Sequence, residues 1–423
     1  MRRPFPPLIL ALIGFSLSAL APHICSAGEQ LVYQGNLNYL GAFRVPQLGS
    51  AGDQNSFDYG GTSLSFNATN NSLFMVGFSQ QQALAEISIP TLGTGPLSGL
   101  KVSSLLQNFK DPTEGKLSQI NPTDPNSKLI GGTLVYNNKL YLTGYSYYDG
   151  SGTQSKTIFA RPLNLSTAGQ VQGPYAVGNQ YQGFVSGYMT PIPATWQASL
   201  GGPMLIGNCC LAIAGIQSNG PAASVFSPAS VGVVDPVPAT PVVGYPSTNP
   251  LAGWGTTNPL YNGSTHVTGI VFPNGTRSVL FFGRHGVGTF CYGPGTSDAS
   301  LAGTTSPSGD PWCYDPTDSS KGTHAYPYKH QVWAYDANDL LTVKNGTKAQ
   351  YAIVPYAVWN FDLPYDGGGM DIGGAAYDPQ TGRIYVSQLY TDVNSGPVIH
   401  VFQVGTGTAT STIPSVPTNL QAH

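Results

Sequence analysis

The sequence carries little charge. Only 9% of its 423 residues are Asp, Glu, Lys or Arg, and just three are Glu. Coiled coils and helical bundles are rich in Ala, Glu, Lys and Leu, so this shortage excludes them. Disordered chains have fewer aromatic residues than the 11% found here. The 53 Gly show no every-third period, which excludes collagen. What remains is a β protein rich in turns and aromatic residues.

The sequence also lacks any cluster of Lys or Arg. Nucleic acids and anionic membranes bind basic surfaces, so we expect neither as a partner. The apolar run 8–20 is too short for a comfortable membrane span. It follows two arginines and precedes the small residues Cys25-Ser26-Ala27, so we interpret residues 1–27 as a secretory signal peptide. Lipid attachment at Cys25 is the alternative. We therefore predict a secreted monomer, extracellular or periplasmic.

Cysteines are few, and four remain after signal cleavage: Cys209, Cys210, Cys291 and Cys313. Export exposes them to an oxidising compartment, where disulfides form. The simplest pairing joins Cys291 to Cys313 and would stabilise the fold by about 3 kcal/mol. Cys209 and Cys210 are then either a vicinal disulfide or two free thiols. Zinc is not expected, because no Cys-x-x-Cys pair occurs.

What the sequence does contain is an internal repeat. Segments 39–46 and 57–67 resemble segments 356–364 and 370–378 near the other end. Each pair has an extended segment ending in Pro, a polar loop, and an Asp-x-Gly-Gly that opens a strand. Three weaker copies lie between these two strong ones. The second small residue of the strand is Gly61 and Gly374 in the strong copies, and Gly132, Gly187 and Gly269 in the weaker copies. We expect these glycines to let strand backbones approach closely, with a direct ligand role as the alternative.

Repeats of four short antiparallel strands with variable outer loops are typical of a β-propeller. We predict an all-β fold, with a five-bladed β-propeller over 28–404. Six blades is the alternative, if 211–225 hides another. Segment 39–45 would supply the outer strand of the last blade, so the N-terminus closes the ring and leaves no open edge. Helices should be nearly absent, with 337–343 the only candidate. Residues 405–423 are interpreted as a low-complexity linker.

One position of the repeat carries chemistry. Two residues before the first small residue, the five copies have Asp58, Leu129, Phe184, His266 and Asp371. These strand starts should converge at the axial mouth. Asp58, His266 and Asp371 could therefore hold a divalent cation such as calcium, or act in acid–base catalysis. The alternative is that the two aspartates only accept hydrogen bonds from turn N–H groups. No other cofactor is indicated.

The ends of the second strands supply further candidates. The string Gly283-Arg-His-Gly-Val-Gly288 places a guanidinium beside an imidazole, and its glycines should expose His285. A hydrogen-bonded loop histidine is the alternative. Other second strands end near Tyr145, Tyr147, Tyr148, Gln388 and Tyr390, and His330 follows the long insertion 292–329. The tyrosines form a hydroxyl-rich aromatic surface suited to sugar rings, although Tyr is also common in half-buried strands.

With this repeat the chain resembles secreted five-bladed propellers of the arabinanase and levansucrase type. That resemblance implies two Asp and one Glu in the axial pocket, and Asp58 and Asp371 match the aspartates by position. Glu86 sits within a predicted strand and Glu114 in an outer loop, so neither matches the Glu. This departure counts against a standard glycoside hydrolase. The segment beginning at Gly373 also resembles uncharacterised exported bacterial proteins.

Polysaccharide lyases with a propeller fold use other chemistry, with His or Tyr as base and acid and Arg or a metal to neutralise a uronate carboxylate. His266, His285, Arg284 and Tyr145 fit this chemistry better than a pair of carboxylates. We therefore predict a secreted protein that acts on extracellular polysaccharide, with these four as catalytic residues. The predicted binding residues are Tyr147, Tyr148, Gln388, Tyr390 and His330. The alternative is a non-catalytic glycan- or protein-binding surface module.

Overall fold

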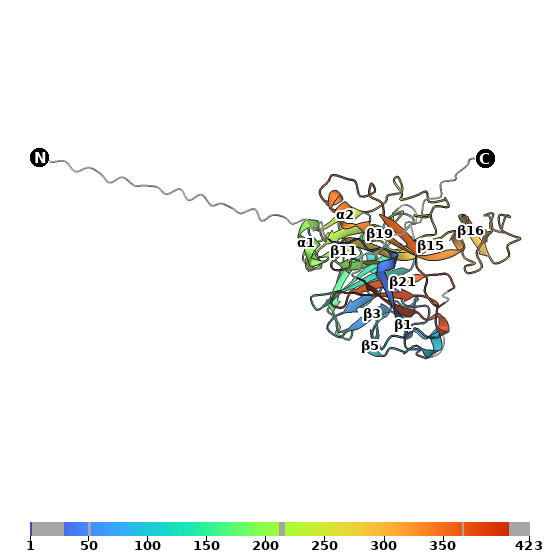
Figure 1. Ribbon diagram of the computed structural model, residues 1–423, viewed down its shortest axis with the longest axis horizontal. Helices are drawn as coiled ribbons and strands as arrows, with labels where there is room; N and C mark the ends of the chain where they lie inside the picture. Colours follow the sequence, from blue (N-terminus) through green and yellow to red (C-terminus); the bar gives the residue numbers. More distant parts are fainter. Residues whose placement is uncertain (2–28, 50–51, 211–215, 366–367, 406–423) are drawn as a thin grey trace.

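The computed structural model describes residues 1, 29–49, 52–210, 216–365 and 368–405. In this part of the chain the protein is all-β, with two short α-helices, α1 (Ala194–Leu200) and α2 (Ala337–Lys344) (Figure 1). The expected signal peptide, apart from Met1, and the expected linker beyond residue 405 lie outside the described residues. No described helix is long and apolar enough to cross a membrane.

The strands form five four-stranded antiparallel sheets in the described part of the chain. The first sheet contains β2 (Ser65–Asn67), β3 (Ser72–Val76), β4 (Leu84–Ser88) and β5 (Leu105–Lys110). The second contains β6 (Lys128–Tyr136), β7 (Lys139–Ser146), β8 (Ile158–Pro162) and β9 (Gln172–Tyr175). The third contains β10 (Met189–Pro191), β11 (Met204–Ile206), β12 (Ala223–Phe226) and β13 (Ala239–Val243).

The last two sheets carry the candidate site. The fourth contains β14 (His266–Val271), β15 (Ser278–Gly286), β19 (Tyr328–Asp336) and β20 (Ala357–Asn360). The fifth contains β21 (Ile372–Asp378), β22 (Arg383–Gln388), β23 (Val398–Val404) and β1 (Leu37–Arg44). The predicted repetition of four-stranded units is therefore confirmed. Segment 211–225, weighed above as part of an extra unit, contributes β12 to the third sheet, while 211–215 lie outside the described residues.

Strand β1 comes from the N-terminal part of the chain and β23 from the C-terminal part. They pair antiparallel, with Leu37 opposite Val404 and Arg44 opposite Val398. This is the pairing that the similarity of 39–46 to 356–364 predicts. The chain ends of the folded part are thus tied into one sheet, which covers an edge that would otherwise be open to another strand.

The hydrophobic core is divided among the interfaces between sheets. Five clusters of buried apolar side chains lie between the first and second, second and third, third and fourth, fourth and fifth, and fifth and first sheets. The first strands also contact one another in the order β2, β6, β10, β14, β21 and back to β2. Each sheet therefore packs against two neighbours, and the five first strands lie together.

The marker glycines have the structural role expected of them. In β6, β14 and β21 the register shifts by one residue immediately before Gly132, Gly269 and Gly374. A Cβ on Gly132 would clash with the backbone oxygen of Gly187, which lies two residues before the neighbouring first strand, β10. A bulge bends a strand, and a missing side chain lets the backbones approach. The repeated small residues thus mark where first strands crowd together.

The sequence predicts a helix only at 337–343, which corresponds to α2. The structure contains a second helix, α1, that was not predicted. Residues 194–200 carry Trp196 and Leu200 at helical spacing on the buried side, and both are nearly fully buried. Gly201 ends the helix with φ +87°, the left-handed conformation that glycine adopts most easily. The described residues also form six short 3₁₀ helices: Gln34–Asn36, Leu97–Gly99, Leu117–Ile120, Gln182–Val185, Pro228–Ser230 and Val393–Ser395.

The long insertion of the fourth sheet folds into a small sheet of its own. It contains β16 (Cys291–Thr296), β17 (Cys313–Tyr314) and β18 (Lys321–His324), and it projects from the end of β15 (Figure 1). The predicted disulfide between Cys291 and Cys313 is present, with Cα atoms 5.6 Å apart. Cys209 and Cys210 are also bonded to each other, which is one of the two alternatives left open by the sequence.

Candidate functional site

Three charged or titratable side chains meet where the first strands of the fourth and fifth sheets begin. Arg284 donates from one terminal nitrogen to Asp371 Oδ2 (3.1 Å) and to the carbonyl oxygen of Gly369 (3.2 Å). Its other terminal nitrogen lies 3.3 Å from His266 Nε2. His266 Nδ1 is 3.7 Å from Asp371 Oδ1. We call His266, Arg284 and Asp371 the charged cluster.

Backbone pairing fixes this geometry. His266, the first residue of β14, lies directly opposite Arg284 on β15. Asp371 immediately precedes β21, and its carbonyl oxygen accepts a hydrogen bond from Leu389 N. Thr268 Oγ1 donates to Ile372 O (2.6 Å) and so ties β14 to β21 beside the cluster. The three side chains are therefore held by rigid strands from two sheets, an arrangement suited to precise chemistry.

The hydrogen bonds also define the protonation state of His266. A guanidinium can only donate, so His266 Nε2 accepts and the ring proton sits on Nδ1, toward Asp371. Burial and the neighbouring Arg284 charge lower the pKa of His266 well below its usual value. Burial raises the pKa of Asp371, and the positive charge of Arg284 opposes that change. The cluster thus offers a neutral imidazole base and a carboxyl group with increased proton affinity.

Arg284 itself is unusual. The residue is only 8% exposed, yet its Nε has no hydrogen-bond partner in the described structure. Buried guanidinium nitrogens are normally paired, because an unpaired buried donor costs free energy. The guanidinium also lies over the ring of Tyr328, with Cζ 4.2 Å from the ring centroid. Arg284 therefore carries one buried donor, Nε, that the described structure leaves uncompensated.

The insertion supports Arg284 through this tyrosine. Tyr328 donates its hydroxyl to Asp315 Oδ2 (2.6 Å), and His324 Nδ1 lies 2.9 Å from the same oxygen. Hydrogen bonds from these partners hold the pKa of Asp315 well below its usual value, despite burial. The carboxylate in turn raises the pKa of His324, against the effect of burial. Sequence reasoning missed this support, because it depends on how the insertion folds back.

Tyrosines surround the cluster. Tyr390 follows β22 and is 43% exposed. Burial of its hydroxyl raises the pKa, and the charges of Asp371 and Arg284 act on it as well, which places the phenol close to the cluster. Burial raises the pKa of Tyr145, and the nearby phenols of Tyr147 and Tyr390 raise it further. Tyr147 and Tyr148 are exposed. Four of the predicted tyrosines therefore come from the strand ends on this side.

The backbone beside the cluster adopts rare conformations. Met370, next to Asp371, has φ +58°, and Tyr390 has φ +56°. Tyr59, which follows Asp58 at the equivalent point of the first sheet, has φ +52°. Non-glycine residues seldom adopt this left-handed region, and such outliers gather at functional sites. Other residues with positive φ, such as Asn71 and Asn137, lie in turns at the opposite ends of the strands, so this strain is not confined to the cluster.

The structure places His285 away from the cluster. Its ring is 1% exposed, Nδ1 lies 2.9 Å from Thr265 Oγ1, and the ring packs edge-on against Trp333. The expectation that neighbouring glycines expose this imidazole is therefore wrong. Successive side chains of a strand point to opposite faces, so Arg284 and His285 cannot both face the cluster. Burial lowers the pKa of His285 to about 4.

Two predicted binding residues are also internal. Gln388 is fully buried, donating to Tyr365 O (2.8 Å) and lying 2.8 Å from His400 Nε2. His330 is 3% exposed and packs against Phe361, and burial lowers its pKa to about 4. Neither side chain is presented to a ligand at the surface, because both lie within strands that are buried on both faces.

Asp58 accepts a hydrogen bond from a turn N–H group, which is the alternative role given for it above. It is 1% exposed, and its Oδ2 accepts a hydrogen bond from Gly52 N (2.7 Å). Among the described residues, no group of three or more His, Cys, Asp and Glu side chains is arranged to hold a metal ion. The charged cluster has two such residues, His266 and Asp371, and the third position is taken by Arg284.

Glu86 is held as a structural carboxylate. It is fully buried and accepts hydrogen bonds from Asn67 (2.8 Å), Asn70 (2.9 Å), Ser72 and Gln107 (2.6 Å). These donors lower the pKa of Glu86 although burial alone would raise it. A carboxylate that is satisfied in this way is a poor general acid.

No protein-family model and no curated protein sequence matches the chain. Solved structures give weak likenesses. A GH43 endo-arabinanase from Bacillus licheniformis is 11% identical, with a TM-score of 0.41 over 85% of this chain and 95% of that one. A structure from the GH130 family of mannoside phosphorylases is 10% identical, with a TM-score of 0.41 over 89% and 96%. A luciferin-regenerating enzyme is 7% identical, with a TM-score of 0.35 over 88% and 95%. These values are too low to carry an inference about this chain.

Proposed function

We propose that this protein is a secreted five-bladed β-propeller that binds uronate-containing polysaccharide at the charged cluster and cleaves it by β-elimination. The ring architecture is supported by the five four-stranded sheets, by first strands that each contact two others, and by the pairing of β1 with β23. The observation that carries the functional proposal is Arg284, a buried guanidinium with an unpaired Nε that touches both a neutral histidine and a carboxyl group.

The chemistry follows from these contacts. A uronate carboxylate would accept hydrogen bonds from Arg284, which neutralises it and makes the adjacent C5–H more acidic. Arg284 would then release His266 Nε2, and this freed lone pair removes the C5 proton. The electron pair forms the C4–C5 double bond and the C4–O4 bond breaks. Tyr390, which its raised pKa keeps protonated, donates its proton to the departing O4.

The electrostatics suit this division of roles. Because its pKa is lowered, His266 is neutral and able to act as a base at neutral pH. Asp371 faces its Nδ1 side and would stabilise the imidazolium that forms once Nε2 is protonated. A retaining or inverting hydrolase would instead need two suitably placed carboxyl groups. Glu86 does not serve as the second, because four donors already occupy it.

The test is to incubate the purified protein with polygalacturonate, alginate and hyaluronate separately, and to follow both ultraviolet absorbance and reducing ends. Elimination raises both signals, because each cleavage creates a conjugated double bond. Reducing ends without absorbance would indicate hydrolysis and overturn the elimination step. The His266→Gln variant should lose the activity while its melting temperature stays within a few degrees of the unsubstituted protein.

A non-catalytic glycan-binding module is the second candidate. It is favoured by Tyr147 and Tyr148, which are 60% and 54% exposed on neighbouring positions after β7. Flat exposed phenols can stack on sugar rings without any chemistry. In this case neither signal would rise, and retention on immobilised polygalacturonate would survive His266→Gln but fail in the Tyr147→Ala, Tyr148→Ala double variant.

A further inference from the structure

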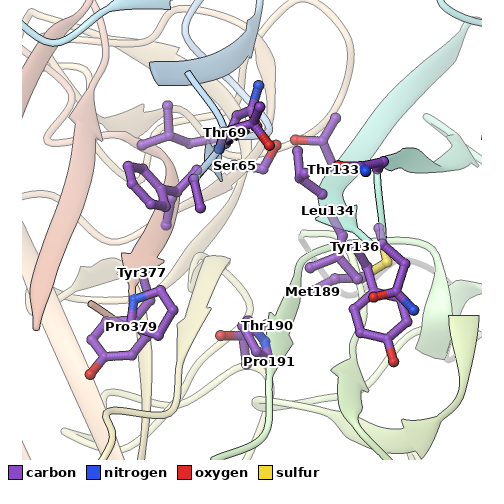
Figure 2. Close-up of a pocket in the computed structure, with 18 residues that line it drawn as sticks. Ser65, Thr69, Thr133, Leu134, Tyr136, Met189, Thr190, Pro191, Tyr377 and Pro379 are labelled. Atoms are coloured by element: carbon purple, nitrogen blue, oxygen red, sulfur yellow. Dashed lines mark hydrogen bonds between the residues drawn. The ribbon is translucent and has the colours of Figure 1, made fainter. Parts of the chain in front are cut away.

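A cavity lies at the end of the first strands opposite the charged cluster (Figure 2). Its volume is about 390 Å³, and it is bounded by the last residues of β2, β6, β10 and β21 and the turns that follow them. Asp371 precedes β21, whereas Tyr377 and Pro379 lie at its far end and line the cavity. A strand rises about 3.3 Å per residue, so the cavity is roughly 20 Å from the charged cluster.

The lining of this cavity is uncharged. None of the described residues that line it is Asp, Glu, Lys, Arg or His. Its polar groups include the hydroxyls of Ser65, Thr69, Thr133 and Thr190, which alternate with apolar surface. A metal ion, a phosphate or a uronate would meet no opposite charge here, and removing an unpaired ion from water is costly. The lining therefore selects an uncharged ligand.

One hydroxyl group in the lining lacks a partner. Ser65 is 5% exposed, and its Oγ makes no hydrogen bond in the described structure. Thr133 differs, because its Oγ1 donates to Ser63 O (2.6 Å) and keeps only acceptor capacity. A buried hydroxyl without a partner costs about 1–3 kcal/mol. Because Oγ is almost completely covered, the Ser65 side chain must rotate toward the cavity before a ligand hydroxyl can pair with it.

We propose that this cavity binds one unit of a neutral sugar. Figure 2 shows Ser65, Thr69 and Thr133 along one side of the cavity, with Tyr377 and Pro379 on another. This arrangement gives a sugar hydroxyl partners on one side and an apolar surface for the ring on the other. The volume lies within the range of small-molecule sites, roughly 300–1,000 Å³. The inference rests on this end of the molecule alone and does not depend on the charged cluster.

The test is a titration of the purified protein with D-glucose, D-galactose, D-mannose, D-xylose and L-arabinose, each followed by saturation-transfer NMR. At least one sugar should bind. Ala68→Trp should abolish that binding, because Ala68 is exposed and lines the cavity, so the indole blocks it without disturbing the core. Ser65→Ala should weaken binding about threefold to tenfold, through one lost hydrogen bond.

Ser103 provides the matched control. Its hydroxyl is also buried and unpaired but lies outside the cavity, so Ser103→Ala should leave sugar affinity unchanged. Absence of binding by all five sugars would overturn the proposal, as would binding that survives Ala68→Trp. Loss of sugar binding in Arg284→Lys would place the sugar at the charged cluster and overturn it too. Failure of the proposed lyase activity would leave each of these results unaffected.

Discussion

The two ends of the five first strands differ in chemistry although the same strands build both. At one end, His266, Arg284 and Asp371 meet among tyrosines and strained backbone. At the other, the lining of a cavity includes no charged residue among those described. The comparison teaches that the two ends of one set of strands can differ in charge, and our two proposals place an anionic ligand at one end and a neutral ligand at the other.

The connections at the two ends also differ. At the uncharged end most first strands join their second strands through short turns, such as the Asn137-Asn138 turn between β6 and β7, where both residues have positive φ, whereas the longer connection from β10 to β11 contains α1. Such turns favour Asn and Gly. At the charged end the connections are long, and the insertion between β15 and β19 reaches back to Arg284 through Tyr328.

Arg284→Lys should have the largest effect. Lysine keeps the positive charge but cannot bond Asp371, His266 and a substrate carboxylate together. We expect kcat/KM for the susceptible uronate polymer to fall about 10³-fold, as when an essential oxyanion contact is lost. Arg277→Lys is the control, because Arg277 precedes the same strand and also pairs with an aspartate, Asp336, at 3.0 Å. Equal losses in both variants would show that Arg284 acts only through stability.

Acid should destabilise the fold through its buried histidines, three of which lie outside the charged cluster. Burial lowers the pKa of His285 and His330 to about 4, and that of His400 to about 3. The unfolded chain binds protons on these residues below about pH 6.5, whereas the folded chain does not. The free energy of unfolding should therefore fall as pH drops from 6.5 toward 4, by on the order of 2 kcal/mol for each histidine. Urea unfolding across this range measures the change.

His324 sharpens the same measurement because its sign is opposite. Its pKa is raised in the folded state by Asp315, so its contribution to stability is present below about pH 6.5 and is lost as pH rises through the folded pKa. His400→Gln should flatten the acid decline, and His324→Gln should leave the decline or steepen it. An unfolding free energy that stays constant from pH 6.5 to 4 would contradict the burial of the three histidines.

Tyr328→Phe should have a moderate effect. The ring stays over Arg284, but the hydroxyl contact with Asp315 is lost, so the guanidinium is held less firmly. We expect KM for the uronate polymer to rise about threefold to tenfold with a smaller change in kcat, since one charge-assisted hydrogen bond is removed. Tyr326→Phe is the control, because its ring contacts Tyr328 without lying on Arg284. A change confined to melting temperature would mean that Tyr328 only stabilises the insertion.

Much of the fold could be predicted because the repeat has a local physical cause. A strand that must bulge and pass close to its neighbour needs a small residue at a fixed point, so Gly132, Gly269 and Gly374 recur in register. Helix α1 was missed because it occupies a connection rather than a repeated strand, and its signals are a short apolar spacing and Gly201. Connections vary between units, so a repeat carries no information about them.

The candidate site was partly predictable for the same reason. His266 and Asp371 occupy one position of the repeat, and strand starts on neighbouring sheets lie together. Arg284 follows from its pairing with His266. The prediction that His285 is catalytic was wrong. Successive side chains of a strand point to opposite faces, so when Arg284 faces the cluster, His285 faces away from it. The support from Tyr328 and Asp315 could not be predicted, since it needs the folded path of the disulfide-bonded insertion.

The smallest effect is expected from a charge placed at the uncharged end. Thr69 is exposed and lines the cavity, so Thr69→Lys should change the free energy of unfolding by less than about 0.5 kcal/mol. The new ammonium would stand roughly 20 Å from the charged cluster, beyond the screening length of about 8 Å at physiological ionic strength. KM for the uronate polymer should therefore change by less than about twofold. The affinity of the cavity for a neutral sugar should change, because Thr69 lines it. A several-fold fall in KM at physiological salt would mean that the polymer reaches both ends, and that the two surfaces act as one.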